Sequence, residues 1–327
     1  MDQGESHEGV LLIGLEPGRL SDAHLASVRA LAPGMRIVVT EDRAEIETLL
    51  DDIEVIFWRF PRDLLARATN LRWFQQLGAG ADWLLRHPEA ARASFVLTNA
   101  SGVHPINITE HILAFLLSFA RRFKPALRAQ SCHEWLRSKG DEVFELAGKT
   151  LLLIGVGSIG QRTAAVTSAM GMRVIGVRRS ASVAVPGVEA MLGPDQLLEA
   201  LPQADFVVLT APLTPETRGM IGERELRAMK PSAYVINVGR GGTIQQMALV
   251  RALEEGWIAG AGLDVFETEP LPEDSPLWDM DNVLITAHYA GATPHYLERA
   301  VEIFLTNLKR YVAGEPLLNV VDKAAGY

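Results

Sequence analysis

Cysteine is almost absent from this chain, because Cys132 is the only one among 327 residues. A single cysteine excludes an intrachain disulfide, and such sparse usage fits a reducing compartment. Long apolar runs are absent too: stretches such as 112–120 are far shorter than the roughly 20 residues that a membrane helix requires. The start, MDQGESHEGV, is polar and acidic and lacks the basic-then-apolar order of a signal peptide. We therefore expect a cytoplasmic globular protein.

Positive charge is also scarce. The chain has 31 Lys and Arg against 40 Asp and Glu, a formal net charge of −9. This balance gives no general attraction to nucleic acid or to an anionic membrane, so neither is expected as a partner. Local cations or backbone N–H groups must then hold any anionic ligand. Hydrophobic residues at 48% and charged residues at 22% argue against disorder, and the length predicts two domains.

Short β-branched runs alternate with helical periods, a pattern typical of βα units in an α/β fold with parallel sheets. The predicted strands are 10–15, 36–39, 55–58, 71–78, 95–99, 150–154, 173–177, 205–210, 234–239, 259–265 and 282–286. The predicted helices include 22–31, 63–68, 161–170 and 296–312. A further helix over 106–123 is apolar almost all round, which indicates burial in the monomer or in a subunit interface.

A glycine motif, GVGSIG, follows the strand 150–154 and opens a helix. Gly155 allows a tight turn, Gly157 lets backbone approach a diphosphate, and Gly160 permits close packing of helix on strand. Ser158 and Ile159 complete the turn, where the helix N-terminus favours the anion. A chance glycine cluster in a loop is the alternative, but the flanking strand and helix favour a dinucleotide site.

The next strand ends in Val177 and is followed by Arg178, Arg179 and Ser180, without the acid that commonly binds free ribose hydroxyls. Arginines and a hydroxyl suit a 2′-phosphate, which needs positive charge and hydrogen-bond donors. The sequence therefore predicts NADP(H), with NAD(H) as the alternative. The other interpretation is that both arginines are solvated surface residues.

Three further residues follow successive predicted strands: Arg240, Glu269 and His288. Ligands bind at the carboxyl ends of parallel strands, where these side chains would meet. Arginine suits a substrate carboxylate and a polarised carbonyl, and histidine suits the proton that accompanies a hydride. The glutamate would hold the imidazole tautomer and stabilise the imidazolium form. Each residue alone could equally have a structural or surface role. The occurrence of all three in this order, after successive strands, favours hydride transfer to a 2-keto acid.

Over nearly its whole length the chain resembles the D-isomer-specific 2-hydroxyacid dehydrogenase family. The matching motifs are LGAGAD (77–82), NASGV (99–103), TEHIL (109–113), GVGSIG (155–160), APLTPET (211–217), INVGRGG (236–242), GLDVFETEPLP (262–272) and TAHYAG (286–291). Their order and spacing are far more specific than the glycine motif alone.

The resemblance implies that Arg240, Glu269 and His288 are the catalytic trio. It also implies that backbone groups of the turn 78–80 receive the substrate carboxylate, and that Asp264 faces the nicotinamide carboxamide. The implied substrate-turn residues are Gly78, Ala79 and Gly80, and the further cofactor residues are Ala211, Pro212, Thr217, Val238, Gly239 and Gly291. No metal ion is expected at the site.

In this family a Rossmann-type dinucleotide-binding domain is inserted into a flavodoxin-like substrate domain. The resemblance implies an inner domain at 103–290 and an outer one at 1–102 and 291–327, with the active site in the cleft and the helix from Ile106 as the contact of a homodimer. Two departures stand out. Arg178 replaces the usual acid, and Ala287 replaces a proline, which changes backbone stiffness more than chemistry.

Substrate identity is open from the sequence. Trp58 and Arg59 end a strand of the outer domain and are predicted to face the substrate side chain. A glyoxylate- or hydroxypyruvate-like acid is expected, while larger 2-keto acids stay open. The alternative function is a dinucleotide-sensing binding protein, because some relatives act as corepressors. The intact trio favours an enzyme.

Overall fold

The computed structural model describes residues 9–324, apart from the side chains of Asp82 and Leu85. Residues 1–8 and 325–327, which include most of the polar N-terminal stretch and both ends of the predicted outer domain, lie outside the described residues. The chain divides into two compact units. Unit 1 combines the residues up to Val103 with those from Pro294 onward, and unit 2 is His104–Thr293.

Unit 1 contains a parallel sheet with the order β2-β1-β3-β4-β5, which is the flavodoxin-like order. The strands are β1 (Val10–Gly14), β2 (Arg36–Val39), β3 (Ile53–Trp58), β4 (Trp73–Gln76) and β5 (Val96–Thr98). The helices are α1 (Asp22–Leu31), α2 (Arg43–Thr48), η1 (Arg62–Arg67), η2 (Asp82–Arg86), α3 (Pro88–Arg92) and α10 (Tyr296–Val312).

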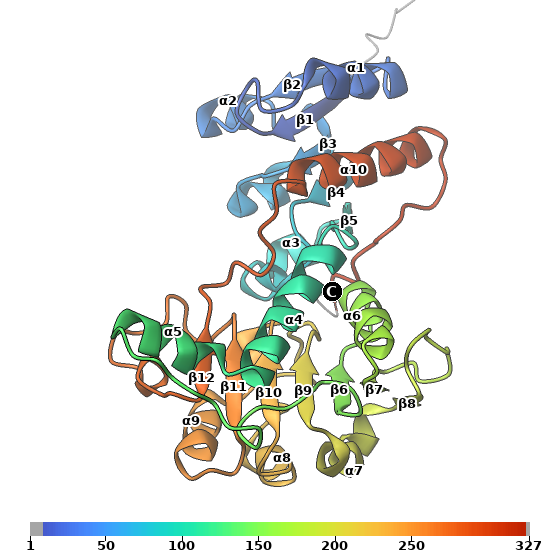
Figure 1. Cartoon of the computed structure of the whole chain (residues 1–327). Helices are drawn as coiled ribbons and strands as arrows, with labels where there is room; N and C mark the ends of the chain where they lie inside the picture. Colours follow the sequence, from blue (N-terminus) through green and yellow to red (C-terminus); the bar gives the residue numbers. More distant parts are fainter. Residues whose placement is uncertain (1–8, 325–327) are drawn as a thin grey trace, which may run out of the picture. The chain divides into compact units, whose positions relative to one another are not determined.

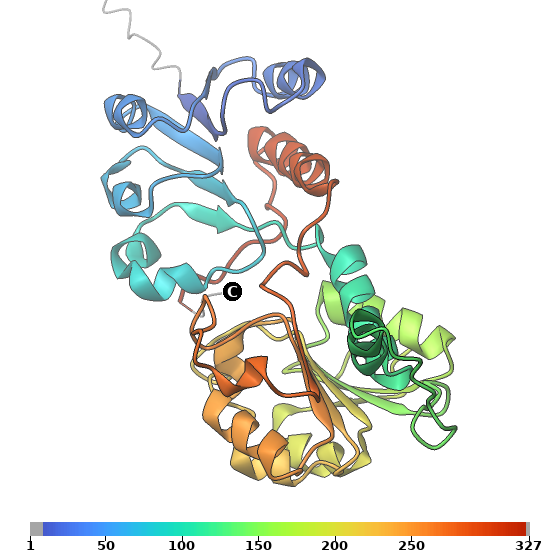
Figure 2. The same ribbon diagram turned by 60° about the vertical axis from the view of Figure 1, so that its left-hand side comes forward.

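Successive side chains along each strand of unit 1 point to opposite faces of the sheet, so the unit has a hydrophobic core on each face. Leu11 and Phe57 pack with α1 and α10, where Phe304 stacks on Phe57 at 4.0 Å between ring centroids. Leu12 and Ile56 point to the other face and pack with α2, η1 and α3. Figure 2 shows α10, from the C-terminal end of the chain, beside the strands of the N-terminal sheet. The N-terminal and C-terminal segments of the chain are thereby joined in one unit.

Unit 2 contains a seven-stranded parallel sheet with the order β8-β7-β6-β9-β10-β11-β12 (Figure 1). The strands are β6 (Thr150–Ile154), β7 (Arg173–Val177), β8 (Ala190–Leu192), β9 (Phe206–Leu209), β10 (Tyr234–Asn237), β11 (Gly260–Leu263) and β12 (Val283–Ile285). This is the Rossmann order extended by one strand, and it reverses between β6 and β9. The predicted α/β fold class is confirmed.

Helices cover both faces of the sheet in unit 2. α4 (Pro105–Ala120) and α6 (Ser158–Ala169) pack on one face, and α7 (Leu197–Ala200), α8 (Glu223–Arg227) and α9 (Gln246–Glu254) pack on the other. The remaining elements are α5 (Phe123–Ser131), η3 (Pro194–Gln196), η4 (Leu201–Gln203), η5 (Gly241–Thr243) and η6 (Pro276–Trp278). With both faces covered, the strands are apolar along most of their length rather than alternating.

The prediction of one helix over 106–123 is wrong. α4 ends at Ala120 and α5 begins at Phe123, with Arg122 between them in the left-handed region at φ 55°. A left-handed residue ends a helix. The segment that follows α5 supports this break: Glu142 forms an ion pair with Arg122, and the Phe144 N–H donates to the Ala120 carbonyl at 3.1 Å. These contacts join residues about 20 positions apart, so the local sequence pattern does not reveal the break at Arg122.

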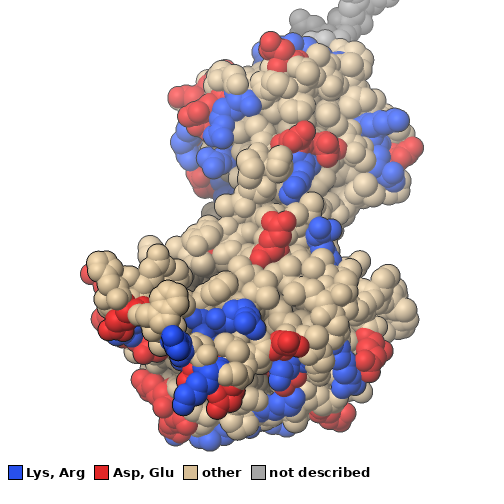
Figure 3. Space-filling view, viewed as in Figure 1, with Lys and Arg blue, Asp and Glu red and all other residues tan. Residues whose placement is uncertain are grey.

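The surface carries mixed charge. On the face in Figure 3, Lys and Arg side chains are interspersed with Asp and Glu over both units. Within residues 9–324, no helix combines the length and the apolar character needed to cross a bilayer.

Candidate active site

The glycine motif forms a tight turn at the end of β6. Gly155 has φ 97°, and a Cβ there would lie 2.6 Å from the Ala211 nitrogen, so only glycine fits. A Cβ on Gly160 would lie 2.4 Å from the Gly155 oxygen, so α6 packs directly on the turn. Gly157 is the N-cap residue of α6, and apart from its chain neighbours nothing lies within 4 Å of its Cβ position. No side chain caps the helix. These features fit a diphosphate at the N-terminus of α6.

The loop after β9 lies against this turn. Thr217 closes the loop, since its hydroxyl donates to the Pro212 carbonyl at 2.6 Å and accepts from the Thr214 N–H at 2.8 Å. A Cβ on Gly239, which follows Val238 at the end of β10, would lie 2.9 Å from the Ala211 oxygen. The predicted residues at 155–160, 211–217 and 238–239 therefore meet at the point where the strand order reverses, the usual ligand position of such sheets.

The loop after β7 is shaped by Arg178. Its guanidinium donates to the carbonyls of Ser180 at 2.7 Å and Val183 at 3.0 Å, which folds the loop back on itself. Arg179 acts on the β9 loop: the pKa of Glu216 is lowered mainly by a hydrogen bond from Thr214, and the charge of Arg179 lowers it further. The two predicted arginines thus differ, because one forms the loop and the other faces the neighbouring loop.

Glu269 and His288 form a close pair. His288 Nδ1 lies 2.6 Å from Glu269 Oε2. A carboxylate only accepts, so Nδ1 carries the proton of this bond and Nε2 is left for a ligand. The other oxygen, Glu269 Oε1, accepts from the Phe266 N–H at 3.0 Å, which fixes the carboxylate from both sides. The His288 side chain is 50% exposed, so it is reachable.

Arg240 follows β10 in a turn closed by a buried asparagine. Asn237 accepts from the Gly239 N–H at 3.1 Å and donates to the Arg240 carbonyl at 3.1 Å. A Cβ on Gly241 would lie 1.9 Å from the backbone of Phe266, so this turn packs directly on the segment that holds Glu269. The structure thus brings the three predicted catalytic residues onto loops in direct contact. Asn237 was missed as a site residue, although its place at a strand end before Val-Gly-Arg was a usable signal.

Asp264 is 1% exposed, and its carboxylate holds the segment around His288. It accepts from the Thr286 hydroxyl at 2.6 Å, the Tyr289 N–H at 3.0 Å and the Ala290 N–H at 3.1 Å. Gly291 follows directly, with the His104 ring 3.3 Å from its Cβ position. The nicotinamide contact of Asp264 stays a prediction.

In unit 1 the turn 78–80 is held by its carbonyl groups. The acceptor and donor pairs are Gly78 O with Ala100 N at 2.8 Å, Ala79 O with Asn99 Nδ2 at 2.8 Å, and Gly80 O with Gln76 Nε2 at 2.7 Å. In a trans peptide the N–H points opposite to the C=O. The N–H groups of Ala79 and Gly80 therefore point away from these anchors, an arrangement that suits an anion. Gln76 and Asn99 were missed, because nothing in the sequence shows which buried amides anchor a turn.

Two aromatic rings lie beside this turn. Trp58 ends β3 at φ 88° and is 7% exposed, with its ring edge-on to Tyr296 at 5.6 Å between centroids. Burial raises the pKa of the Tyr296 hydroxyl, while a hydrogen bond from the Gly78 backbone acts against this shift. The side chain of Arg59 is exposed. Tyr296, at the start of α10, is a further residue at this turn that the sequence did not reveal.

Comparison with known proteins gives the family. A model of the family described as D-isomer specific 2-hydroxyacid dehydrogenase, NAD binding domain, matches residues 113–290. The chain is 35% identical to a glyoxylate reductase of Thermococcus litoralis over 299 aligned residues. The aligned region covers 88% of this chain and 87% of the relative. It is 38% identical to a glyoxylate reductase of Aeropyrum pernix, over 84% of this chain and 82% of the relative. The chain belongs to the D-isomer-specific 2-hydroxyacid dehydrogenase family.

Solved structures of this family agree. A D-isomer specific 2-hydroxyacid dehydrogenase from Xanthobacter autotrophicus Py2, in complex with NADPH and MES, has a TM-score of 0.83 at 31% identity and covers 98% of this chain and 100% of that chain. An NADPH-dependent glyoxylate/hydroxypyruvate reductase from Sinorhizobium meliloti has a TM-score of 0.82 at 29% identity, with the same coverage. The predicted family and the predicted enzyme class, a nicotinamide-dependent oxidoreductase, are confirmed.

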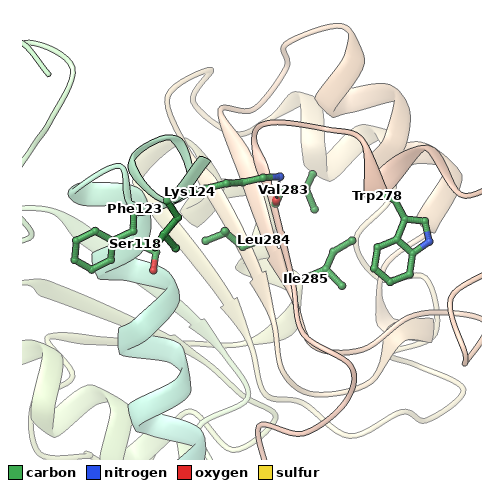
Figure 4. Close-up of a pocket in the computed structure, with 8 residues that line it drawn as sticks. Ser118, Phe123, Lys124, Trp278, Val283, Leu284 and Ile285 are labelled. Carbon is green, nitrogen blue, oxygen red and sulfur yellow. Dashed lines mark hydrogen bonds between the residues drawn. The ribbon is translucent and has the colours of Figure 1, made fainter. Parts of the chain in front are cut away.

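One hollow of this dehydrogenase lies elsewhere on unit 2 (Figure 4). It has a volume of about 280 Å³ and is lined by Ser118, Phe123, Lys124, Leu127, Trp278, Val283, Leu284 and Ile285. The Lys124 ammonium donates to the carbonyls of Met280 at 2.6 Å and Val283 at 2.7 Å. Its charge is therefore engaged by backbone groups of unit 2. The hollow is a largely apolar surface feature, separate from the residues predicted for catalysis.

Proposed function

We propose that this dehydrogenase reduces a small 2-keto acid, of the size of glyoxylate or hydroxypyruvate, with NADPH, and that it is D-specific. The observation that carries the proposal is the His288–Glu269 pair at 2.6 Å, on loops packed against the Arg240 turn. A corepressor-like role has no observation in its favour. The names of the relatives from Thermococcus litoralis and Sinorhizobium meliloti support a small keto acid as substrate.

The proposed roles follow from the geometry. The glycine turn and the N-terminus of α6 would hold the diphosphate of the dinucleotide, which supplies the hydride when bound. His288 Nε2 donates the proton that the carbonyl oxygen takes up as the hydride reaches the carbonyl carbon. Glu269 accepts the hydrogen bond from Nδ1 and so holds the ring with Nε2 available to the substrate. Arg240 binds the carboxylate and polarises the carbonyl.

The turn 78–80 is proposed to bind the substrate carboxylate through backbone N–H groups. Its three carbonyls are already tied within unit 1, so its N–H groups are aimed before a ligand arrives. Trp58 and Tyr296 lie next to this turn, and Arg59 follows Trp58 in the chain. These three residues are proposed to limit the size of the substrate side chain.

The loop after β7 supports NADPH over NADH. Arg179 and Ser180 are exposed there, and Arg178 folds the loop that presents them. The structures from Xanthobacter autotrophicus and Sinorhizobium meliloti contain NADPH and NADP. A 2′-phosphate would gain charge-assisted hydrogen bonds at this loop, whereas a ribose hydroxyl would not.

The experiment that tests the proposed function follows NADPH absorbance with a panel of 2-keto acids, from glyoxylate and hydroxypyruvate to branched and aromatic acids. Turnover with small acids, and a D-configured product where the product is chiral, would support the proposal. Absence of turnover with every acid, together with tight NADPH binding, would favour the dinucleotide-sensing alternative.

A homodimer is also proposed. Phe123, Leu127 and Trp135 are 51%, 64% and 88% exposed on α5 and the segment that follows it, and such apolar surface commonly marks an interface. Light scattering should report about twice the chain mass of 35.7 kDa. Leu127→Glu should shift the mass toward the monomer, while Leu318→Glu, a control in unit 1, should not. A monomer at every concentration would contradict the dimer.

A further inference from the structure

A chain of hydrogen bonds joins α4 to the segment that carries His288. His111 Nε2, on α4, lies 2.9 Å from the Thr286 hydroxyl. That hydroxyl lies 2.6 Å from Asp264 Oδ1, and the same carboxylate accepts the N–H groups of residues 289 and 290. His111 is thus connected to the residues before and after His288 without touching His288 itself.

The direction of these bonds follows from the donors available. A threonine hydroxyl has one proton, and Asp264 only accepts, so the Thr286 proton points to Asp264. Toward His111 the hydroxyl oxygen then accepts, and His111 Nε2 must carry a proton. Burial lowers the pKa of His111, with the Asp264 charge acting against this shift, which favours the neutral ring protonated at Nε2.

The His111 ring is held firmly in place. It lies edge-on to the Phe115 ring at 4.9 Å and to the Tyr289 ring at 5.5 Å between centroids. Tyr289 is the residue after His288, so the ring supports this segment by packing as well as by its hydrogen bond.

The segment needs such support because the His288 backbone is strained. His288 has φ 53°, in the left-handed region that costs free energy for residues other than glycine. Residue 287 is alanine, so no proline restricts the chain before it. The holding bonds are those to residue 264: the His288 N–H donates to the Asp264 carbonyl at 2.8 Å, and the following N–H groups donate to its carboxylate.

We propose that His111 and Thr286 are positioning residues for His288: the His111 Nε2–H fixes the Thr286 hydroxyl, which orients the Asp264 carboxylate and thereby holds His288 in its left-handed conformation. This inference rests on the proposed function, in which His288 donates the proton. His111 and Thr286 are not proposed to touch substrate or cofactor. Their effect is on the alignment of His288 Nε2.

The test uses the full chain with glyoxylate and NADPH as the probes. Thr286→Val and His111→Leu each break the chain of bonds and should lower kcat about tenfold, the size expected for one lost supporting hydrogen bond. Thr286→Ser and His111→Gln keep the hydroxyl and the donor and should recover most of the loss. Since the two residues act in series, the double variant Thr286→Val/His111→Leu should lose no more than the worse single variant.

A further readout separates positioning from a loss of stability. KM for glyoxylate should stay within about twofold of the wild type while kcat falls, a split that a general loss of folded protein would not produce. Thr109→Val is the matched control. It removes another buried hydroxyl contact of α4, that with Thr163 at 3.1 Å, and should leave kcat unchanged.

The outcomes distinguish this inference from the proposed function. If Thr286→Val and His111→Leu keep wild-type kcat while His288→Gln loses it, the positioning role is wrong and the proposed function stands. Losses that multiply in the double variant, or a serine variant as slow as the valine variant, would also overturn the positioning role. If His288→Gln itself keeps turnover, the proposed function fails first.

Discussion

In unit 1 the candidate carboxylate turn offers backbone N–H groups, whereas in unit 2 the candidate catalytic groups are side chains at strand ends. The turn 78–80 depends on Gln76 and Asn99, which anchor its carbonyls from within the unit. Arg240, Glu269 and His288 instead present their own side chains, and Asn237 and Asp264 fix the backbone beneath them. The difference predicts which kinetic constant each group of residues controls most. The His288–Glu269 pair of unit 2 should govern the rate of the chemical step, and the turn 78–80 of unit 1 should act mainly on the affinity for the keto acid.

The largest expected effect is at His288. His288→Gln removes the proposed proton donor and should lower kcat by roughly 10²–10⁴-fold, the range for loss of a general acid. NADPH affinity should be nearly unchanged. His24→Gln, at a half-buried histidine on α1 of unit 1, serves as the control. Near-normal turnover of the His288 variant, measured by NADPH absorbance, would remove unit 2 as the source of the proton.

Gln76→Leu tests the other half of the comparison. It leaves the Gly80 carbonyl and the Trp83 indole N–H without their partner, so the turn 78–80 should lose its alignment. KM for the keto acid should rise roughly tenfold, as expected for a lost buried hydrogen bond, with a smaller change in kcat.

Gln75→Leu is the matched control for this variant. Gln75 is the adjacent buried glutamine, but its side chain bonds Thr98 and Asn307 instead of the turn. Both variants should lower the thermal unfolding temperature, and only Gln76→Leu should raise KM. Equal KM values for the two variants would show that the turn does not bind the carboxylate.

Cofactor choice is a comparison within unit 2. The loop after β7 should make kcat/KM with NADPH exceed that with NADH by about tenfold, since one charge-assisted hydrogen bond is worth roughly 1.5–3 kcal/mol. Arg178→Asp should abolish this preference, because it removes a positive charge and the bonds that fold the loop. Arg173→Asp makes the same change of charge at the opposite end of β7 and should leave the preference for NADPH unchanged. Equal efficiencies with NADH and NADPH in the wild type would refute the preference.

Much of the fold was predictable because its signals are local. Strands such as Arg36–Val39 and helices such as Tyr296–Val312 have the predicted bounds, since apolar runs and helical periods extend over neighbouring residues. The break at Arg122 and the edge strand β8 were not predicted. The break depends on contacts with Glu142 and Phe144. The strand β8 (Ala190–Leu192) has no β-branched residue, whereas the equally short β5 and β12 do.

The candidate site divides in the same way. Chemistry-bearing side chains at strand ends, such as His288, are visible in a sequence because their type and order are informative. Supporting residues are not, because their role depends on partners far away in the chain. His111 and Thr286 are 175 positions apart and meet only in the folded unit.

Glu269 is proposed to hold His288 as the proton donor, and the kcat of Glu269→Gln tests this role most directly. Glu269 Oε2 lies 2.6 Å from His288 Nδ1, and a carboxylate can only accept that N–H, which leaves Nε2 for the substrate. An amide also offers donors and no longer fixes this ring tautomer. With glyoxylate and NADPH, Glu269→Gln should lower kcat by roughly ten- to a hundredfold relative to the wild type, as expected for the loss of one hydrogen bond to a charged group. A kcat equal to that of the wild type would contradict the role of the pair.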